Sequence, residues 1–194
     1  MRSSMPRVVA LLLAAGRGRR FGSDKRLARL PDGRGLLAAS AERALQVFAE
    51  VHVLLRDEDD AQALGLPAAC RVIRCQDADQ GMGHSLAAGV KALAGCEADA
   101  IAVLLGDMPW VAADSLWQLC QQAAAERIVY PLYDGQRGHP VLFGRVFWPQ
   151  LQALRGDEGA RVLLQAQAAA CQGVALADPG VLRDVDRPQA LLTD

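Results

Sequence analysis

Short apolar runs alternate with helix-spaced segments along most of the chain. The runs Val8–Leu13 and Ala100–Leu105 are apolar at consecutive positions, which is typical of strands covered on both faces. The pattern predicts strands near Val8–Leu13, Val51–Leu55, Arg71–Cys75, Ala100–Leu105, Ile128–Leu132 and Val174–Leu176.

Between these runs the apolar residues recur at helical spacing, most clearly in Leu36–Phe48. The acidic run Asp57–Asp60 is interpreted as the solvated start of a helix, because acidic side chains favour a helix N-terminus. Helices are therefore expected near Leu36–Phe48, Asp59–Leu64, His84–Leu93, Ala113–Ala125, Asp157–Ala170 and Pro188–Leu192.

Strands that alternate with helices predict an α/β fold with right-handed crossovers. We expect a single domain over residues 7–194, preceded by a flexible segment at residues 1–6. The domain is expected to be three-layered and Rossmann-like, with a mostly parallel central sheet and helices on both faces. Ligands of such sheets bind beyond the carboxyl ends of the strands.

Composition narrows the class of protein. The 194 residues are 52% hydrophobic and 22% charged, which argues against disorder. The formal net charge of −1 provides no overall field to attract nucleic acid or a membrane surface. No apolar stretch approaches the ~20 residues that span a bilayer, and the first residues lack the apolar core of a signal peptide. A cytoplasmic location is therefore expected.

The richest chemistry lies directly after the first predicted strand. The segment 11–25 reads LLLAAGRGRRFGSDK and holds Gly16, Gly18 and Gly22 together with Arg17, Arg19, Arg20 and Lys25. Glycines let backbone N–H groups approach an anion, and the basic side chains suit a polyphosphate. The spacing fits neither the P-loop nor the dinucleotide fingerprint. The alternative is an ordinary strand-to-helix turn with solvated arginines.

Two acidic motifs come later in the chain. Asp107 follows the buried run Ala100–Leu105 within Gly-Asp-Met-Pro, and Asp184 and Asp186 form an Asp-x-Asp pair near the C-terminus. Carboxylates beside phosphates are typical Mg²⁺ ligands. The alternatives are that Asp107 caps a turn and that Asp186 caps a terminal helix.

Three weaker motifs complete the set, and each has a purely structural alternative as a strand entry or a helix cap. They are Gly81-Met82-Gly83-His84-Ser85, Gly138-His139-Pro140-Val141 and Gly156-Asp157-Glu158-Gly159-Ala160-Arg161.

In this order, the motifs resemble those of the molybdenum-cofactor nucleotidyltransferase family, and most of all its molybdopterin cytidylyltransferase branch. The resemblance runs from about residue 7 to residue 190. It implies the nucleotidyltransferase version of the fold and an enzyme that uses Mg²⁺ to transfer a nucleotidyl group from CTP or another NTP. The acceptor implied is a phosphorylated pterin-type molecule, with a molybdenum hydroxylase as a partner.

The resemblance also assigns roles to residues. Lys25 and Arg19 would be catalytic, Asp107 and Asp186 would hold the metal, and Ala15 favours CTP because Leu-Ala-Gly-Gly at the loop start goes with GTP. The nucleotide would contact Leu13, Ala14, Ala15, Gly16, Gly18, Arg20, Lys25, Gly81, Met82, Gly83 and Ser85. The acceptor would contact His139, Pro140, Asp157 and Arg161.

Some residues depart from the family pattern. Arg187 replaces the usual threonine after the last acid, and the loop Pro31–Gly35 is bulkier than the usual turn. A nucleotidyltransferase for another phosphorylated acceptor is therefore one alternative. A non-catalytic molybdenum-cofactor carrier and a purely structural α/β domain are two others.

Overall fold

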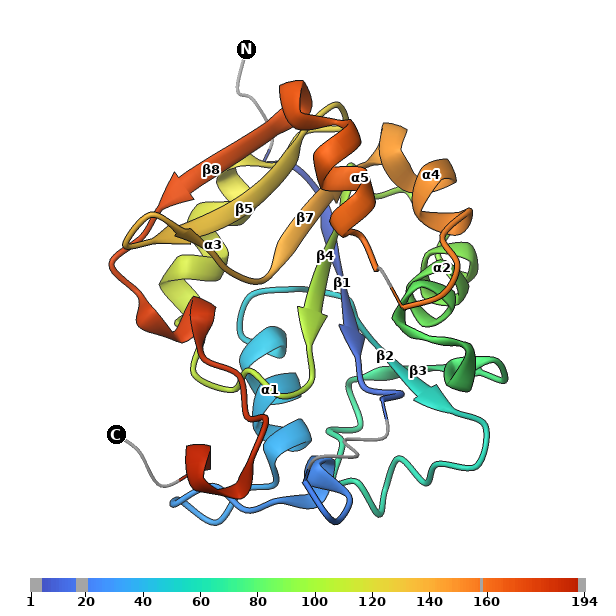
Figure 1. Cartoon of the computed structure of the whole chain (residues 1–194), viewed down its shortest axis with the longest axis vertical. Helices are drawn as coiled ribbons and strands as arrows, with labels where there is room; N and C mark the ends of the chain where they lie inside the picture. Colours follow the sequence, from blue (N-terminus) through green and yellow to red (C-terminus); the bar gives the residue numbers. More distant parts are fainter. Residues whose placement is uncertain (1–4, 17–20, 158, 192–194) are drawn as a thin grey trace.

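The computed structural model describes residues 5–16, 21–157 and 159–191. Within them, eight strands form one sheet in the order β3-β2-β1-β4-β7-β5-β6, and β8 pairs with β5 (Figure 1). The predicted α/β class, with a mostly parallel central sheet, is confirmed.

One half of the sheet is entirely parallel. It consists of β1 (Val8–Leu13), β2 (Val51–Arg56), β3 (Arg71–Cys75) and β4 (Ala100–Leu105). In the register, Leu11 of β1 lies between His52 of β2 and Val103 of β4. The apolar sequences of β1 and β4 suit these central positions, because helices cover both of their faces. The carboxyl ends of β1 and β4 therefore lie side by side.

The other half of the sheet contains both parallel and antiparallel strand pairs. β7 (Val141–Gly144) runs antiparallel to β4 and to β5 (Ile128–Tyr133). β8 (Cys171–Ala175) is parallel to β5, and the two-residue β6 (Gln136–Arg137) is antiparallel to it. β6 was not predicted, because two residues show no strand period. β7 was expected only through the alternative interpretation of Gly138-His139-Pro140-Val141 as a strand entry, because it is short and directly follows Pro140.

Helices cover both faces of the sheet, with α3 on one side and α2, α4 and α5 grouped on the other in Figure 1. α1 (Leu36–Leu45) and α3 (Ala113–Gln122) pack on one face through residues such as Leu37 and Leu116. α2 (Met82–Ala92), α4 (Trp148–Gln152) and α5 (Arg161–Ala166) pack on the other. Alternate residues of β1 belong to the two cores, which makes three layers.

Three expected helices differ from the structure, and the terminal one is a 3-10 segment. The prediction of a helix at Asp59–Leu64 is wrong, because this segment forms turns. The Asp59 carboxylate accepts the Arg56 backbone N–H at 2.9 Å. The helix expected over Asp157–Ala170 is shorter and consists of α5 followed by a 3-10 turn at Ala168–Ala170. Gly156 and Gly159 adopt φ values of 66° and 55°, which an α-helix does not allow.

Short 3-10 segments connect these elements at Lys25–Leu27 (η1), Ala78–Gln80 (η2), Arg145–Phe147 (η3), Ala168–Ala170 (η4), Pro179–Leu182 (η5) and Pro188–Leu191 (η6). The last of them was expected as a terminal helix. In the part of the chain that is described, no helix is both long and apolar enough to cross a bilayer.

Candidate functional site

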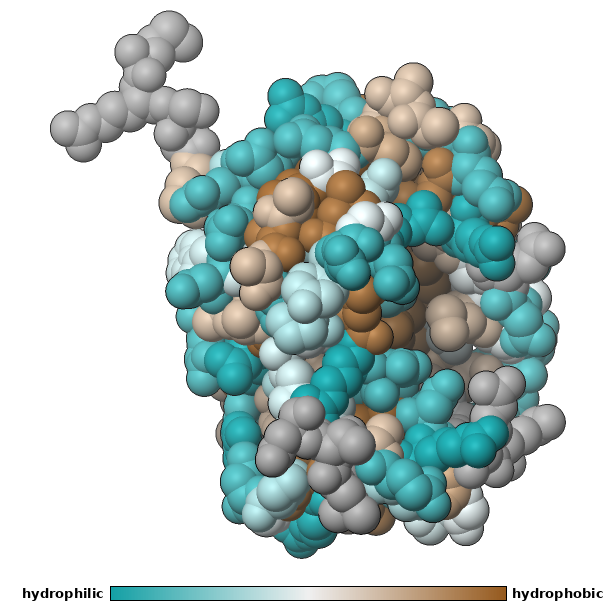
Figure 2. Space-filling view, turned by 60° about the vertical axis from the view of Figure 1, so that its left-hand side comes forward, coloured by the Kyte–Doolittle hydropathy of each residue, from teal (hydrophilic) through white to brown (hydrophobic). Residues whose placement is uncertain are grey.

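A pocket of about 390 Å³ opens at the carboxyl ends of β1 and β4. Figure 2 shows a hollow in the molecular surface with apolar residues inside it and hydrophilic residues around it. Ten of the residues predicted for the site line the pocket: Leu13, Ala14, Ala15, Gly16, Lys25, Gly81, Met82, Ser85, Asp107 and Asp157.

Lys25 connects three distant parts of the chain. It begins η1, which Asp24 caps by accepting the Arg26 backbone N–H. The Lys25 Nζ lies 2.6 Å from Asp107 Oδ2 and 3.9 Å from Asp186 Oδ1. It also donates to the Val185 carbonyl at 3.1 Å. The structure thus brings the lysine of the first loop together with both predicted metal ligands.

Three carboxylates form a compact acidic cluster beside this lysine. One oxygen from each of Asp107, Asp184 and Asp186 lies within 4.8 Å of the others. Burial, and then the charges of Asp186 and Asp107, raise the pKa of Asp184. Carboxylate oxygens at such spacing suit a hard divalent cation.

Backbone packing holds the C-terminal acids in place. The Val185 N–H donates to the Asp107 carbonyl at 3.0 Å. The Val185 side chain is fully buried in a small apolar cluster with Leu30, Leu36 and Ala39. Because residues alternate sides in an extended segment, burying Val185 turns Asp184 and Asp186 away from that cluster.

The N-terminus of α2 forms another wall of the pocket. Gly81 has φ 114°, and a Cβ there would lie 2.4 Å from Asp157 Oδ1 and 2.5 Å from the Gly156 carbonyl oxygen. The Gly83 N–H donates to the Gly156 carbonyl at 2.7 Å. The Gly156 N–H in turn donates to His84 Nδ1 at 3.0 Å. The glycines therefore permit the close contact that brings Asp157 to the pocket.

Several predicted residues, including the expected metal ligand Asp186, do not line this pocket. Gly83 is buried beneath it, and Arg161 is exposed on α5. His139 and Pro140 border a separate cavity of about 10 Å³ between the sheet and the α1 and α3 helices. Burial lowers the pKa of His139. Gly18, Arg19 and Arg20 lie outside the described residues.

Residues 138–140 contact the segment that precedes the C-terminal acids. The His139 N–H donates to the Val181 carbonyl at 2.8 Å, and a Cβ at Gly138 would lie 2.3 Å from that same oxygen. In this structure the Gly-His-Pro motif therefore supports the C-terminal segment. Its role in acceptor binding stays a prediction.

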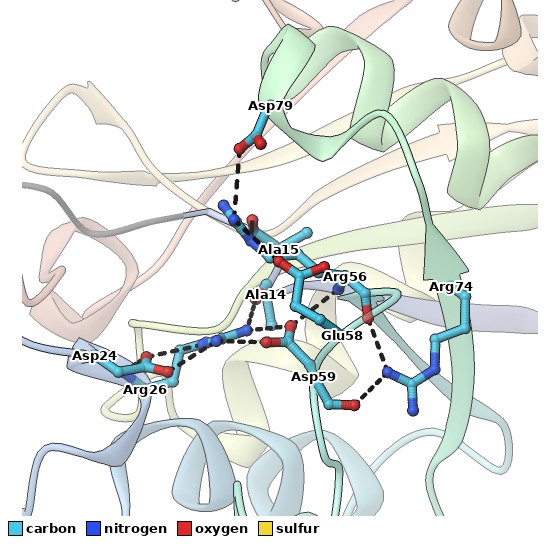
Figure 3. A network of polar contacts seen from close by, with 9 residues as sticks. All are labelled: Ala14, Ala15, Asp24, Arg26, Arg56, Glu58, Asp59, Arg74 and Asp79. Carbon is cyan, nitrogen blue, oxygen red and sulfur yellow. Dashed lines mark hydrogen bonds and ion pairs between the residues drawn. The ribbon is translucent and has the colours of Figure 1, made fainter.

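Sequence reasoning missed a polar network at the opposite side of the pocket (Figure 3). Arg26, Arg56 and Asp79 line the pocket but were not predicted for the site. Arg56 directly follows the mostly apolar run Val51–Leu55 at the end of a predicted strand, which is a signal that the sequence carries, and in the structure it is only 7% exposed. The partner of Arg26 could not be found this way, because Asp59 is 33 residues away along the chain.

Comparisons with known proteins agree with this geometry. Residues 10–171 match the family model of the MobA-like NTP transferase domain. Purine catabolism protein PucB of Bacillus subtilis (strain 168) is 34% identical over 95% of this chain and 94% of that protein. Nicotine blue oxidoreductase of Paenarthrobacter nicotinovorans is 28% identical over 95% and 94%.

Solved structures of Rv0371c from Mycobacterium tuberculosis H37Rv are similar as well. One has a TM-score of 0.85 at 26% identity and covers 98% of this chain and 100% of that one. The Rv0371c complex with manganese has a TM-score of 0.78 at 26% identity and covers 93% of both chains.

The sheet, the pocket at its carboxyl edge and these matches define the class of protein, which is a nucleotidyltransferase. Within that class, the chain belongs to the MobA-like NTP transferase domain family. The family resemblance seen in the motifs is thereby confirmed.

Proposed function

We propose that this protein transfers a cytidylyl group from CTP to a phosphorylated pterin-type acceptor, such as molybdopterin or the molybdenum cofactor, in a Mg²⁺-dependent reaction. The observation that carries the proposal is the contact of Lys25 with Asp107, both of which line the pocket, together with the position of Asp186 and Asp184 directly beside Asp107. A cation and an acidic cluster side by side suit a triphosphate and its metal ion.

In the proposed reaction, a phosphate oxygen of the acceptor attacks the α-phosphorus of CTP. The bond from that phosphorus to the oxygen bridging to the β-phosphate breaks, and pyrophosphate leaves. Negative charge builds on the α-phosphate oxygens, so the Lys25 ammonium is suited to stabilise the transition state. Such a transfer needs positioning and charge neutralisation more than it needs a nucleophilic side chain.

The donor set of the acidic cluster fits the metal that the family implies. Asp107 is mostly buried, whereas Asp186 keeps 58% of its side chain exposed toward solvent, where a hydrated ion can enter. Asp107 and Asp186, with Asp184 beside them, would hold Mg²⁺. When bound, the ion would supply charge neutralisation for the triphosphate. The manganese complex of Rv0371c supports a divalent cation in this family.

The preference for CTP rests on Ala15, which lines the pocket between Ala14 and Gly16. In the family, Leu-Ala-Ala-Gly at this place goes with CTP. The pterin-type acceptor, and a molybdenum hydroxylase as the partner that receives the product, rest on the resemblance of the motifs over the whole chain.

A thermal-shift panel of the four ribonucleoside triphosphates with Mg²⁺ tests the nucleotide part of the proposal. CTP should raise the Tm most, because under the proposal it binds most tightly. A ligand at 100 times its Kd stabilises the folded state by about 2.7 kcal/mol. Pyrophosphate release with and without molybdopterin then tests the acceptor. Absence of any shift with all four nucleotides would refute the proposal, and pterin binding without CTP consumption would indicate a carrier instead.

A further inference from the structure

The polar network of Figure 3 holds the two peptide groups that begin the first loop. Arg26 Nη1 donates to the Ala14 carbonyl at 3.0 Å, and Arg56 Nε donates to the Ala15 carbonyl at 2.7 Å. In a trans peptide the C=O and the N–H point in opposite directions. Fixing these two oxygens therefore fixes the directions of the Ala15 and Gly16 N–H groups, which have no acceptor among the hydrogen bonds between described residues.

Every N–H of the Arg26 guanidinium is already used. Nε and Nη2 donate to Asp24 at 2.9 and 2.8 Å, Nη1 and Nη2 donate to Asp59 at 2.5 and 2.8 Å, and Nη1 also donates to Ala14. An arginine has five such donors, so this side chain has none left for a phosphate. Although Arg26 lines the pocket, its contacts are those of a structural group.

Asp59 joins the two arginines. Its carboxylate binds the Arg26 guanidinium and accepts the Arg56 backbone N–H, and its side chain is only 8% exposed. Arg74 of β3 then donates to the Arg56 and Asp59 carbonyls at 2.8 and 2.5 Å. The start of the loop is thereby tied to the ends of β2 and β3.

The same contacts fix the backbone on both sides of Lys25. Asp24 and Arg26 flank this lysine and are bonded to each other, and Arg26 is anchored to Asp59. Lys25 itself points the other way, toward Asp107. The direction of its ammonium group therefore depends on contacts that lie on the far side of the backbone.

We propose that Arg26, Arg56 and Asp59 act as a loop clamp, a set of positioning residues that orients the loop N–H groups and Lys25 for a nucleoside triphosphate. This inference rests on the proposed function for its ligand. The clamp works through the loop, so removing Asp59 should impair nucleotide binding even though Asp59 does not line the pocket.

A direct phosphate contact by Arg26 makes the opposite prediction. Asp59→Asn would then release guanidinium donors and leave nucleotide affinity unchanged or improved. With the clamp, Asp59→Asn and Arg26→Gln each raise the Kd for CTP with Mg²⁺ by roughly 10- to 100-fold, as expected for misplaced binding groups. The effect of the double variant is smaller than the sum of the two single effects, because both changes break the pairing of Arg26 with Asp59.

Arg34→Gln is a matched control. Arg34 also pairs with two carboxylates, Asp32 and Glu42, but on the surface and outside the pocket. The Kd of the Arg34→Gln variant for CTP should stay within about twofold of the parent value. Should Arg26→Gln fail to fold, Arg26→Lys keeps the charge with three donors in place of five and should still weaken binding.

The deciding measurement uses nucleotide-free protein. Amide hydrogen exchange at Ala14 and Leu27, whose N–H groups donate to the Leu54 and Asp24 carbonyls at 3.1 Å each, should become at least about tenfold faster in Asp59→Asn and not in Arg34→Gln. Unchanged exchange in folded Asp59→Asn overturns the clamp, as does faster exchange with parental CTP affinity. If the parent protein binds none of the four nucleotides, the proposed function fails, while the exchange measurement still decides whether the clamp orders the loop.

Discussion

Lys25 and Asp107 form the contact on which the site depends. Their side chains are 19% and 18% exposed, so the 2.6 Å ion pair is only partly screened by water. The sequence predicted each residue separately, because each follows a buried strand within a distinct motif. It also predicted that they share one crevice, because parallel strands end at the same edge.

Lys25→Ala should lower kcat for pyrophosphate release by a factor of roughly 10² or more, because the ammonium acts on charge in the transition state. Asp107→Ala should abolish turnover by removing a metal ligand. Lys91→Ala and Asp114→Ala change the same residue types away from the pocket and should retain parental rates. Near-parental kcat in the Lys25 or Asp107 variant would contradict the assigned roles.

Pairings of side chains across the chain were beyond sequence reasoning. The acidic run that contains Asp59 suggested a solvated helix start, but in the structure this carboxylate is mostly buried and bonded to Arg26 and Arg56. Burial raises its pKa, while the hydrogen bonds from Arg26 and Arg56 lower it, and the net pKa is lowered. Nothing in the spacing of Arg26 and Asp59 indicates that they meet, since their contact depends on how the first loop packs against the end of β2.

Among the elements, α2 and the turn at Gly156–Asp157 depend on each other. The Gly83 N–H and His84 Nδ1 bond to opposite sides of Gly156, so the helix N-terminus and the turn act as one unit. This contact explains why Asp157, far along the chain, reaches the same pocket as Met82.

Gly81→Ala should destabilise the fold by about 1–3 kcal/mol, because alanine is strained at φ 114° and its Cβ meets Asp157 and the Gly156 backbone. It should also weaken CTP binding. Gly95→Ala is the matched control, because its Cβ meets nothing within 4 Å, and it should be neutral or stabilise by up to about 1 kcal/mol. Equal Tm values for the two variants would contradict this account.

Elements differed in how far the sequence predicted them. β1 and β4 were predicted at their observed bounds, because six consecutive apolar residues allow few alternatives. β8 was predicted at Val174–Leu176 but lies at Cys171–Ala175, where Gln172 and Gly173 interrupt the apolar pattern of a partly exposed strand. β7 could not be assigned from its own residues alone, because four residues after a proline carry too little signal. Its place in the sheet depends on pairing with β4 and β5.

At the scale of the whole molecule, acid should weaken the loop clamp and the Asp24 contact with Arg26 beside it. Hydrogen bonds from Arg26 lower the pKa of Asp24, and the pKa of Asp59 is lowered as well. A carboxyl whose pKa is lower in the folded protein stabilises that state above its unfolded pKa of about 4. This stabilisation is lost progressively as the pH falls below that value.

Urea unfolding between pH 7 and pH 3 measures this effect. The free energy of unfolding should fall below about pH 4 in the parent protein, and it should fall less steeply in Asp59→Asn, which has one fewer carboxylate to protonate. At pH 7 the variant should be the less stable protein. Identical pH dependence in both proteins would show that Asp59 does not contribute.

The hydrogen bond from Val185 to Asp107 also has a consequence for biosynthesis. Ribosomes extend a protein from its N-terminus, so Lys25 and Asp107 are made well before Asp184 and Asp186. The nascent polypeptide can shape the crevice early but has only one of the three clustered acids until translation reaches residue 184. Under the proposed function, a copy that stops before residue 184 lacks two of these acids and should not consume nucleotide.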